Sequence, residues 1–162
     1  MKVIGIDPGS RFTGWGVVEQ RNGRLYHIDS GVLVLDAQRP VAERLADIYS
    51  GVEKIVQVCE PQCASVEEVF LSHNVQSALK LGQARGAAIV ALSRNGLPIN
   101  EYSARQIKLA VVGNGKAEKQ QVQHMVKLIL GLPEFPEENA ADALAAAICH
   151  LHSYSVPGAI LK

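Results

Sequence analysis

Two β-rich runs joined by a tight-turn dipeptide constrain the fold of this chain more than any other feature. The runs TGWGVVEQ (13–20) and RLYHIDSGVLVL (24–35) flank Arg21-Asn22-Gly23, and Asn-Gly is the strongest short-range signal for a β-hairpin. The short apolar run VIGI before Asp7 predicts a buried strand over residues 2–7. The first 35 residues therefore predict a meander of three strands.

The remainder of the chain alternates helical and β patterns. Residues 40–58 have apolar side chains at helical spacing, and CASVEEVF (63–70) and LPINEY (97–102) are typical of strands. A long helix is expected between Asn74, a plausible N-cap, and Gly96. Further helices are expected from about Ala104, Ala117 and Glu137. A meander followed by strands that alternate with helices predicts an α/β fold with a mixed sheet and helices on its faces.

The composition is that of one cytoplasmic globular domain. A chain of 162 residues with 48% hydrophobic and 20% charged residues can bury one core. Lys2 is followed by only four apolar residues, which does not fit a signal peptide, and no apolar run approaches the length of a membrane helix. Cys59 and Cys63 lack the spacing of a zinc or redox pair, so we expect reduced thiols. We expect residues 1–162 to form a single domain whose last few residues are a flexible tail.

Charge is distributed unevenly along a chain whose formal net charge is zero. Residues 72–133 contain eight Lys or Arg against two Glu, a net charge of +6, while residues 1–71 and 134–162 each carry −3. A polyanion bound by the middle of the chain, with carboxylates supplied by both ends, would fit this pattern. Solvated helix faces would fit the charges equally well.

Three carboxylates stand in positions where burial would be costly. Asp7 ends the first strand, Glu67 lies inside a strand, and Asp142 interrupts a helix of small apolar residues. Each has a structural explanation alone: a turn at Asp-Pro-Gly, an exposed strand position, and an acid near a helix N-terminus. Brought together, the three would repel one another unless divalent cations lay between them, and hard cations such as Mg²⁺ prefer oxygen ligands.

Six motifs in order along the whole chain are similar to one known family. They are GIDPGSRFTGWGVV from residue 5, EEVF at 67–70, SALKLGQARG at 77–86, EYSARQIK at 101–108, AEKQQVQHMV at 117–126 and AADALAAAICH at 140–150. With these motifs the chain resembles the RuvC family of bacterial Holliday-junction resolvases. The resemblance implies an RNase H-like fold with a mixed five-stranded sheet, a homodimer, and Mg²⁺-dependent cutting of two strands of a four-way DNA junction in recombination and repair. It also implies a partner in the RuvA–RuvB branch-migration complex.

The resemblance assigns catalytic and metal-ligating roles to four residues. Asp7 and Glu67 match the first two acidic ligands, and Asn139 and Asp142 match a pair three residues apart. Two Mg²⁺ ions per site are implied, with Mn²⁺ as a substitute. Asn139 departs from the family, which has an acid or a histidine there. Two functions therefore stay open: a junction resolvase, or a junction-binding protein with weak or no cleavage. An actin-like or sugar-kinase-like domain also begins with a strand, an Asp and a Gly-Ser turn, but it needs two lobes and a much longer chain.

The resemblance also implies a DNA-binding surface and a dimer interface. Lys108 and Lys119 match DNA-binding positions, and Phe70 is either core or an aromatic that stacks on a base. The predicted DNA-binding residues are Phe70, Arg105, Lys108, Lys116 and Lys119. Glycine inside a helix costs about 1 kcal/mol relative to alanine, so close packing explains the small residues of the long helix. The predicted dimer-interface residues are Ala78, Gly82 and Gly86.

Overall fold

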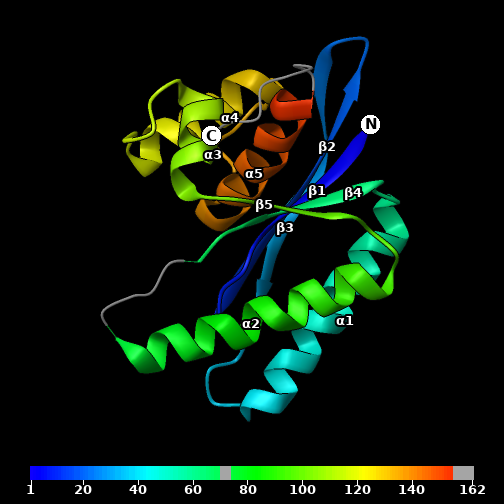
Figure 1. The fold of residues 1–162 in the computed structure, drawn as a ribbon, viewed down its shortest axis with the longest axis vertical. Helices are drawn as coiled ribbons and strands as arrows, with labels where there is room; N and C mark the ends of the chain where they lie inside the picture. Colours follow the sequence, from blue (N-terminus) through cyan, green and yellow to red (C-terminus); the bar gives the residue numbers. More distant parts are fainter. Residues whose placement is uncertain (70–73, 155–162) are drawn as a thin grey trace.

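A mixed five-stranded sheet lies at the centre of the molecule (Figure 1). The computed structural model describes residues 1–69 and 74–154. The strand order is β3-β2-β1-β4-β5, with β1 antiparallel to β2 and parallel to β4. The strands are β1 (Lys2–Asp7), β2 (Phe12–Arg21), β3 (Arg24–Val34), β4 (Cys63–Glu67) and β5 (Ile99–Tyr102). The predicted α/β class and five-stranded mixed sheet are confirmed.

The β2–β3 hairpin turns at the predicted dipeptide. Asn22 has a φ of 50° and Gly23 a φ of 77°. Two central residues with positive φ are typical of a type I′ turn, whose twist matches that of the flanking strands. The pairing of Arg21 with Arg24 closes the hairpin directly around this turn.

Among the described residues, five helices flank the sheet, and their boundaries follow the expected signals closely. They are α1 (Val41–Cys59), α2 (Val75–Arg94), α3 (Ala104–Val112), α4 (Lys119–Leu130) and α5 (Glu138–Tyr154). The side chain of Asn74 accepts a hydrogen bond from the Ser77 amide (3.1 Å), as expected of an N-cap. Within 1–69 and 74–154, none of the helices has the length and apolar character needed to cross a bilayer.

One strand is shorter than predicted. The β pattern extends over 63–70, but β4 ends at Glu67. The Glu68 amide still donates to the carbonyl of Tyr102 on β5, whereas Val69 is no longer in the strand. Phe70 lies outside the described residues.

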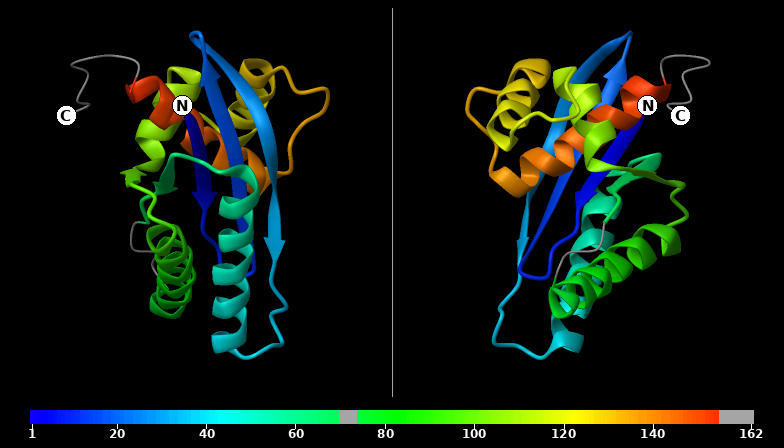
Figure 2. Two further views of the ribbon diagram at one scale, coloured as in Figure 1. Left: turned by 90° about the vertical axis from the view of Figure 1, so that its right-hand side faces the viewer. Right: turned by 60° about the vertical axis from the view of Figure 1, so that its left-hand side comes forward.

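The sheet separates two hydrophobic cores. Helices α3, α4 and α5 pack on one face, and α1 and α2 on the other (Figure 2). Successive residues of β1 alternate between the cores, with Val3 in the first and Ile4 and Ile6 in the second. The odd-numbered positions of β1 therefore face α5.

Helix α5 lies directly on the sheet at two points where the strands carry glycine. A Cβ added at Gly5 would come 1.9 Å from the carbonyl oxygen of Ala143, and one at Gly14 would come 2.0 Å from that of Asn139. On β4, Ser65 Oγ donates a hydrogen bond to the carbonyl of Ala146 (2.7 Å). Glycine permits this close backbone approach. The contact fixes the height and the register of α5 over the ends of β1 and β4.

Candidate active site

Two of the predicted carboxylates lie side by side at the ends of neighbouring parallel strands. The register pairs Ile6 of β1 with Val66 of β4, and Asp7 and Glu67 follow as the last residue of each strand. Strand residues alternate between faces, so Asp7 lies on the face that Gly5 presents to α5, and Glu67 on the face of Ser65. Both carboxylates therefore point toward α5.

Helix α5 brings the third carboxylate to the same place. Asp142 precedes Ala143, whose carbonyl lies over Gly5. A cavity of about 270 Å³ is lined by Asp7, Glu67 and Asp142, with apolar walls from α3 and α4. Three acidic residues that are far apart in the sequence thus meet in one hollow, as the sequence analysis anticipated.

Burial and mutual repulsion disfavour the charged forms of these acids. Burial, followed by the nearby Asp142 and Glu67 carboxylates, raises the pKa of Asp7 to about 7. Burial, followed by repulsion from Asp142, raises the pKa of Glu67. Burial also raises the pKa of Asp142, although the Lys119 ammonium partly offsets that effect. A site that is this unfavourable to its own negative charge is suited to binding cations.

Two lysines line the same cavity and supply positive charge. Lys108 comes from α3, and Lys119 is the first residue of α4. Lys119 Nζ lies 2.7 Å from Glu138 Oε1 and 3.5 Å from Asp142 Oδ2. The Lys119 side chain is 65% exposed, so these ion pairs are open to solvent and screened by salt. The ammonium group is therefore held at the mouth of the cavity, where it can exchange carboxylate for another anion.

The donor set fits a hard divalent cation. Carboxylate oxygens are the ligands that Mg²⁺ prefers. A bound cation would also reduce the electrostatic repulsion among Asp7, Glu67 and Asp142. Among the described residues, no three His, Cys, Asp or Glu side chains lie close enough to enclose a metal ion as they stand. In this arrangement the Asp142 carboxylate lies beside the Lys119 ammonium group.

Asn139 is not among the residues that line the cavity, and it is held by a residue that the sequence analysis missed. Its Nδ2 and its backbone amide each donate to the Glu137 carboxylate at 2.8 Å. The Glu137 carboxylate also accepts from the Ala140 amide (3.1 Å) and so caps α5. Glu138, which binds Lys119, was missed as well. The acidic pair just before an apolar helix was the available signal, and a helix-dipole role would have explained it equally well.

The other predicted DNA-binding residues lie outside the cavity. Arg105 is exposed on α3 and packs beside Gly115 in the α3–α4 connection, and Lys116 is exposed in that connection. Neither lines the carboxylate cavity. Phe70 falls outside the described residues. Only Lys108 and Lys119 of the predicted basic set are thus placed beside the acids.

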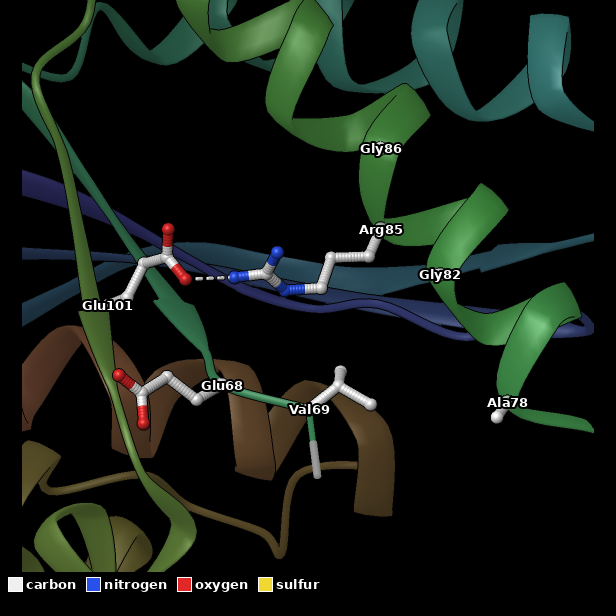
Figure 3. Close-up of a pocket in the computed structure, with 7 residues that line it drawn as sticks. All are labelled: Glu68, Val69, Ala78, Gly82, Arg85, Gly86 and Glu101. Carbon is white, nitrogen blue, oxygen red and sulfur yellow. Dashed lines mark hydrogen bonds and ion pairs between the residues drawn. The ribbon is translucent and has the colours of Figure 1, made fainter. Parts of the chain in front are cut away.

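The small residues of α2 border a separate open groove (Figure 3). Ala78, Gly82 and Gly86 line this groove, and a Cβ added at either glycine would have no described atom within 4 Å. Arg85 crosses it to form an ion pair with Glu101 of β5. Arg85 Nε also donates to the backbone carbonyl of Glu67 (3.4 Å). The open face of α2 therefore has a direct polar link to the end of β4.

The fold and the site together define a class. A mixed sheet in the order β3-β2-β1-β4-β5 with helices on its faces is the architecture of RNase H-like resolvases. In this chain, carboxylates stand at the ends of β1 and β4 and on α5. A sequence model of the family described as crossover junction endodeoxyribonuclease RuvC matches residues 3–150. The chain belongs to this family, whose members are metal-dependent nucleases.

Individual relatives and solved structures agree with this assignment. The crossover junction endodeoxyribonuclease RuvC of Geotalea uraniireducens is 55% identical over 162 residues, covering 100% of this chain and 94% of the relative. That of Geobacter sulfurreducens is 55% identical over 153 residues, covering 94% of this chain and 93% of the relative. The structure of Thermus thermophilus RuvC in complex with a Holliday junction substrate matches with a TM-score of 0.90 and 36% identity, covering 95% of this chain and 94% of the other.

Proposed function

We propose that this chain is a structure-selective endonuclease that resolves four-way DNA junctions by paired, metal-dependent phosphodiester hydrolysis in recombination and repair. The observation that carries the proposal is the meeting of Asp7, Glu67 and Asp142 with two lysines in one cavity. The relatives over the full length of the chain are named for this activity.

Four residues would hold two Mg²⁺ ions, for which Mn²⁺ substitutes. Asp7 would contribute to both ions, Glu67 to one, and Asp142 with Asn139 to the other. When bound, the ions supply a more acidic water and stabilise both the attacking and the leaving oxygens of the displacement. The three carboxylates supply the negative field that holds the ions beside the scissile phosphate, and the apolar walls at Ile107 and Val122 limit the access of bulk water.

The basic residues would position the junction. Lys108 and Lys119 lie beside the carboxylates, where they would contact the phosphates that flank the cut. Arg105 and Lys116 would extend the contact along the backbone, and Phe70 would stack on a base where the junction opens. On DNA binding, Lys119 exchanges its carboxylate partners for a phosphate.

We further propose that the functional unit is a homodimer of single-domain chains, each an RNase H-like nuclease domain over residues 1–162. The open groove along α2 supports this interface, because its glycines leave room for a second backbone. A two-fold axis places two active sites for paired cuts on a symmetric junction. The cytoplasm is the proposed location, and the RuvA–RuvB branch-migration complex is the proposed partner.

The alternative function, junction binding with weak or no cleavage, rests on Asn139 alone and is not favoured. The three carboxylates are all present in one cavity, and an Asn side chain still offers a carbonyl oxygen as a ligand. The loss of one charge is expected to weaken metal binding rather than to remove the reaction.

Cleavage of a synthetic four-way junction tests the proposal. With Mg²⁺ or Mn²⁺ we expect paired cuts by the unmodified chain, none by Asp7→Asn, and faster cutting at low metal concentration by Asn139→Asp. A linear duplex of the same sequence is the matched substrate control. Junction binding without cutting by the unmodified chain, with cutting restored in Asn139→Asp, would favour the silent alternative. Undiminished cutting by Asp7→Asn would remove Asp7 from the site.

A further inference from the structure

The side-chain amide of Asn139 has two ends with opposite hydrogen-bonding character, and only one of them is engaged. Nδ2 donates to Glu137 Oε1 at 2.8 Å. An ionised carboxylate can only accept hydrogen bonds, so it can face the amide nitrogen but not the amide oxygen. In the part of the chain that the structure describes, Oδ1 of Asn139 accepts no hydrogen bond.

Glu137 is itself held by hydrogen bonds to the first turn of α5, so it can set the orientation of its neighbour. Its second carboxylate oxygen accepts from the backbone amides of Asn139 (2.8 Å) and Ala140 (3.1 Å). Its carbonyl accepts from the Ala141 amide (2.8 Å), which starts the helical ladder of α5. Three hydrogen bonds from backbone amides in the first turn of α5 therefore hold Glu137, in addition to the bond from the Asn139 side chain.

Asn139 is also fixed relative to the carboxylate cavity. Its backbone and Cβ lie directly over Gly14 of β2, and Gly14 is the pairing partner of Asp7 across the β1–β2 ladder. Asp142, which lines the cavity, follows on the same helix three residues later and therefore lies on the same side of α5. The unengaged oxygen of Asn139 thus belongs to the turn of helix that borders Asp7 and Asp142.

We propose that Glu137 is a positioning residue that locks the Asn139 amide with its nitrogen turned toward Glu137 and its oxygen available to a divalent cation at the Asp7–Asp142 site. Glu137 thereby converts a neutral amide into an oxygen ligand at a position where the family resemblance implies an acid or a histidine. The inference rests on the proposed function, because it assumes a metal site at these carboxylates.

The proposal makes the effect of Glu137 depend on what stands at position 139. With Asn139, Glu137→Gln offers the amide a partner with both a donor and an acceptor, so the amide can turn its oxygen inward. With Asn139→Asp there is no amide to orient, and a carboxylate at 137 only repels the new one. A purely structural role in capping α5 would not distinguish the two backgrounds.

The test is calorimetric titration of the DNA-free full-length protein with Mg²⁺ and with Mn²⁺. We expect Glu137→Gln to weaken metal binding about tenfold, the lower end of what outer-shell substitutions cost. In the Asn139→Asp background we expect the same substitution to leave metal binding unchanged or to strengthen it. Glu134→Gln, an equal loss of charge at an exposed position in the loop before α5, is the matched control and should bind metal as the unmodified chain does.

Three outcomes of the titration would overturn the inference. They are equal weakening by Glu137→Gln in both backgrounds, equal weakening by Glu134→Gln, and no metal binding unless Asn139→Asp is present. Failure of the proposed function has a different signature, because Asp7→Asn would then bind metal as tightly as the unmodified chain. A second readout is the side-chain amide NMR signal of Asn139. It should shift on addition of Mg²⁺ in the unmodified chain, and its failure to shift would also count against the inference.

Discussion

Asp7, Glu67 and Asp142 carry charge in a place where burial and mutual repulsion both oppose it. The raised pKa values of all three share burial as their first cause. In the metal-free protein this is a cost to folding, because the native state binds protons more tightly than the unfolded chain does. The same unfavourable energy becomes a source of affinity when a cation enters.

Asp7→Asn should therefore change how stability depends on pH. The pKa of Asp7 rises from 3.8 to about 7 on folding, so the metal-free protein loses stability as the pH rises between these values. The variant has no carboxylate at position 7, so it does not lose this stability. The free energy of unfolding of Asp7→Asn, relative to that of the unmodified chain, should therefore be about 2–3 kcal/mol higher at pH 8 than at pH 5. Urea unfolding in EDTA at both pH values measures this gain.

Asp36→Asn is the matched control for that experiment. Asp36 is an exposed acid whose side-chain oxygen accepts from the Gln38 amide, a bond that Asn can also make. Adding Mg²⁺ should stabilise the unmodified chain and the control more than Asp7→Asn. A constant difference between Asp7→Asn and the unmodified chain across the pH range would contradict burial and carboxylate repulsion as the origin of the raised pKa of Asp7.

The two cavity lysines should contribute to junction affinity through phosphate contacts. Lys108→Ala and Lys119→Ala are each expected to weaken junction binding and to lower the slope of log affinity against log salt by about 0.9, the value for one lost phosphate contact. Lys54→Ala, an exposed lysine on α1 across the sheet from the cavity, should leave the slope unchanged. Fluorescence anisotropy in Ca²⁺ or EDTA measures the slopes, and an unchanged slope for both cavity variants would remove them from the DNA contact.

At the scale of the elements, the site is assembled by the contact between α5 and the sheet. Gly5 and Gly14 let the helix backbone touch the strands, so Asp142 is brought within interaction range of Asp7 and Glu67. The chemistry thus depends on residues with no functional group of their own.

Gly5→Ala should destabilise the protein and disturb the site together. The new Cβ would lie 1.9 Å from the Ala143 carbonyl oxygen and 2.9 Å from the Ala147 amide nitrogen, so α5 must move. Overpacking of this kind costs about 1–3 kcal/mol or more, and metal affinity should fall as Asp142 shifts. Gln57→Ala, at an exposed position of α1, should instead change the stability by less than about 0.5 kcal/mol. Thermal unfolding of both variants checks this contrast, and a stable Gly5→Ala would mean that α5 is not seated as described.

The elements were largely predictable from local signals, and their closest contacts were not. Asn22-Gly23 and Asn74 act through their own backbone neighbourhood, so short-range rules place the hairpin and the start of α2. Asp7 was singled out because a charge at the end of an apolar run is costly to bury, and Glu67 because it lies inside a predicted strand. Glycine at position 5 is equally compatible with a bulge, a turn or a close approach, and only the tertiary contact with Ala143 decides among them. Glu137 escaped notice because a helix cap explains it without any reference to Asn139.

At the scale of the whole molecule, the proposed active site and the proposed dimer interface lie with different hydrophobic cores on the two sides of the sheet. The carboxylate cavity lies with α3, α4 and α5, and the groove along α2 lies with the other core. Arg85 links the two through Glu101 and the Glu67 carbonyl.

The proposed dimer interface can be tested without touching the proposed active site. Gly82→Leu should abolish dimer formation while the monomer stays folded, because a bulky side chain would fill the space that a second backbone needs. Gln83→Leu is the matched control, since Gln83 lies toward α1 beside Val41 and Lys80. Analytical ultracentrifugation gives the oligomeric state, and circular dichroism gives the fold. A Gly82→Leu protein that still sediments as a dimer would exclude this face.

The glycines of β1 and β2 that contact α5 affect which substitutions this protein tolerates. In a saturation mutagenesis screen scored by repair of damaged chromosomes, Gly5 and Gly14 should be as intolerant as the acids themselves. The same loss of activity would thus have two different causes: the loss of a reactive carboxylate in some variants and the displacement of α5 in others. The two would separate only when each dead variant is also scored for soluble expression, which the acid-to-amide changes should preserve and the glycine changes should lower.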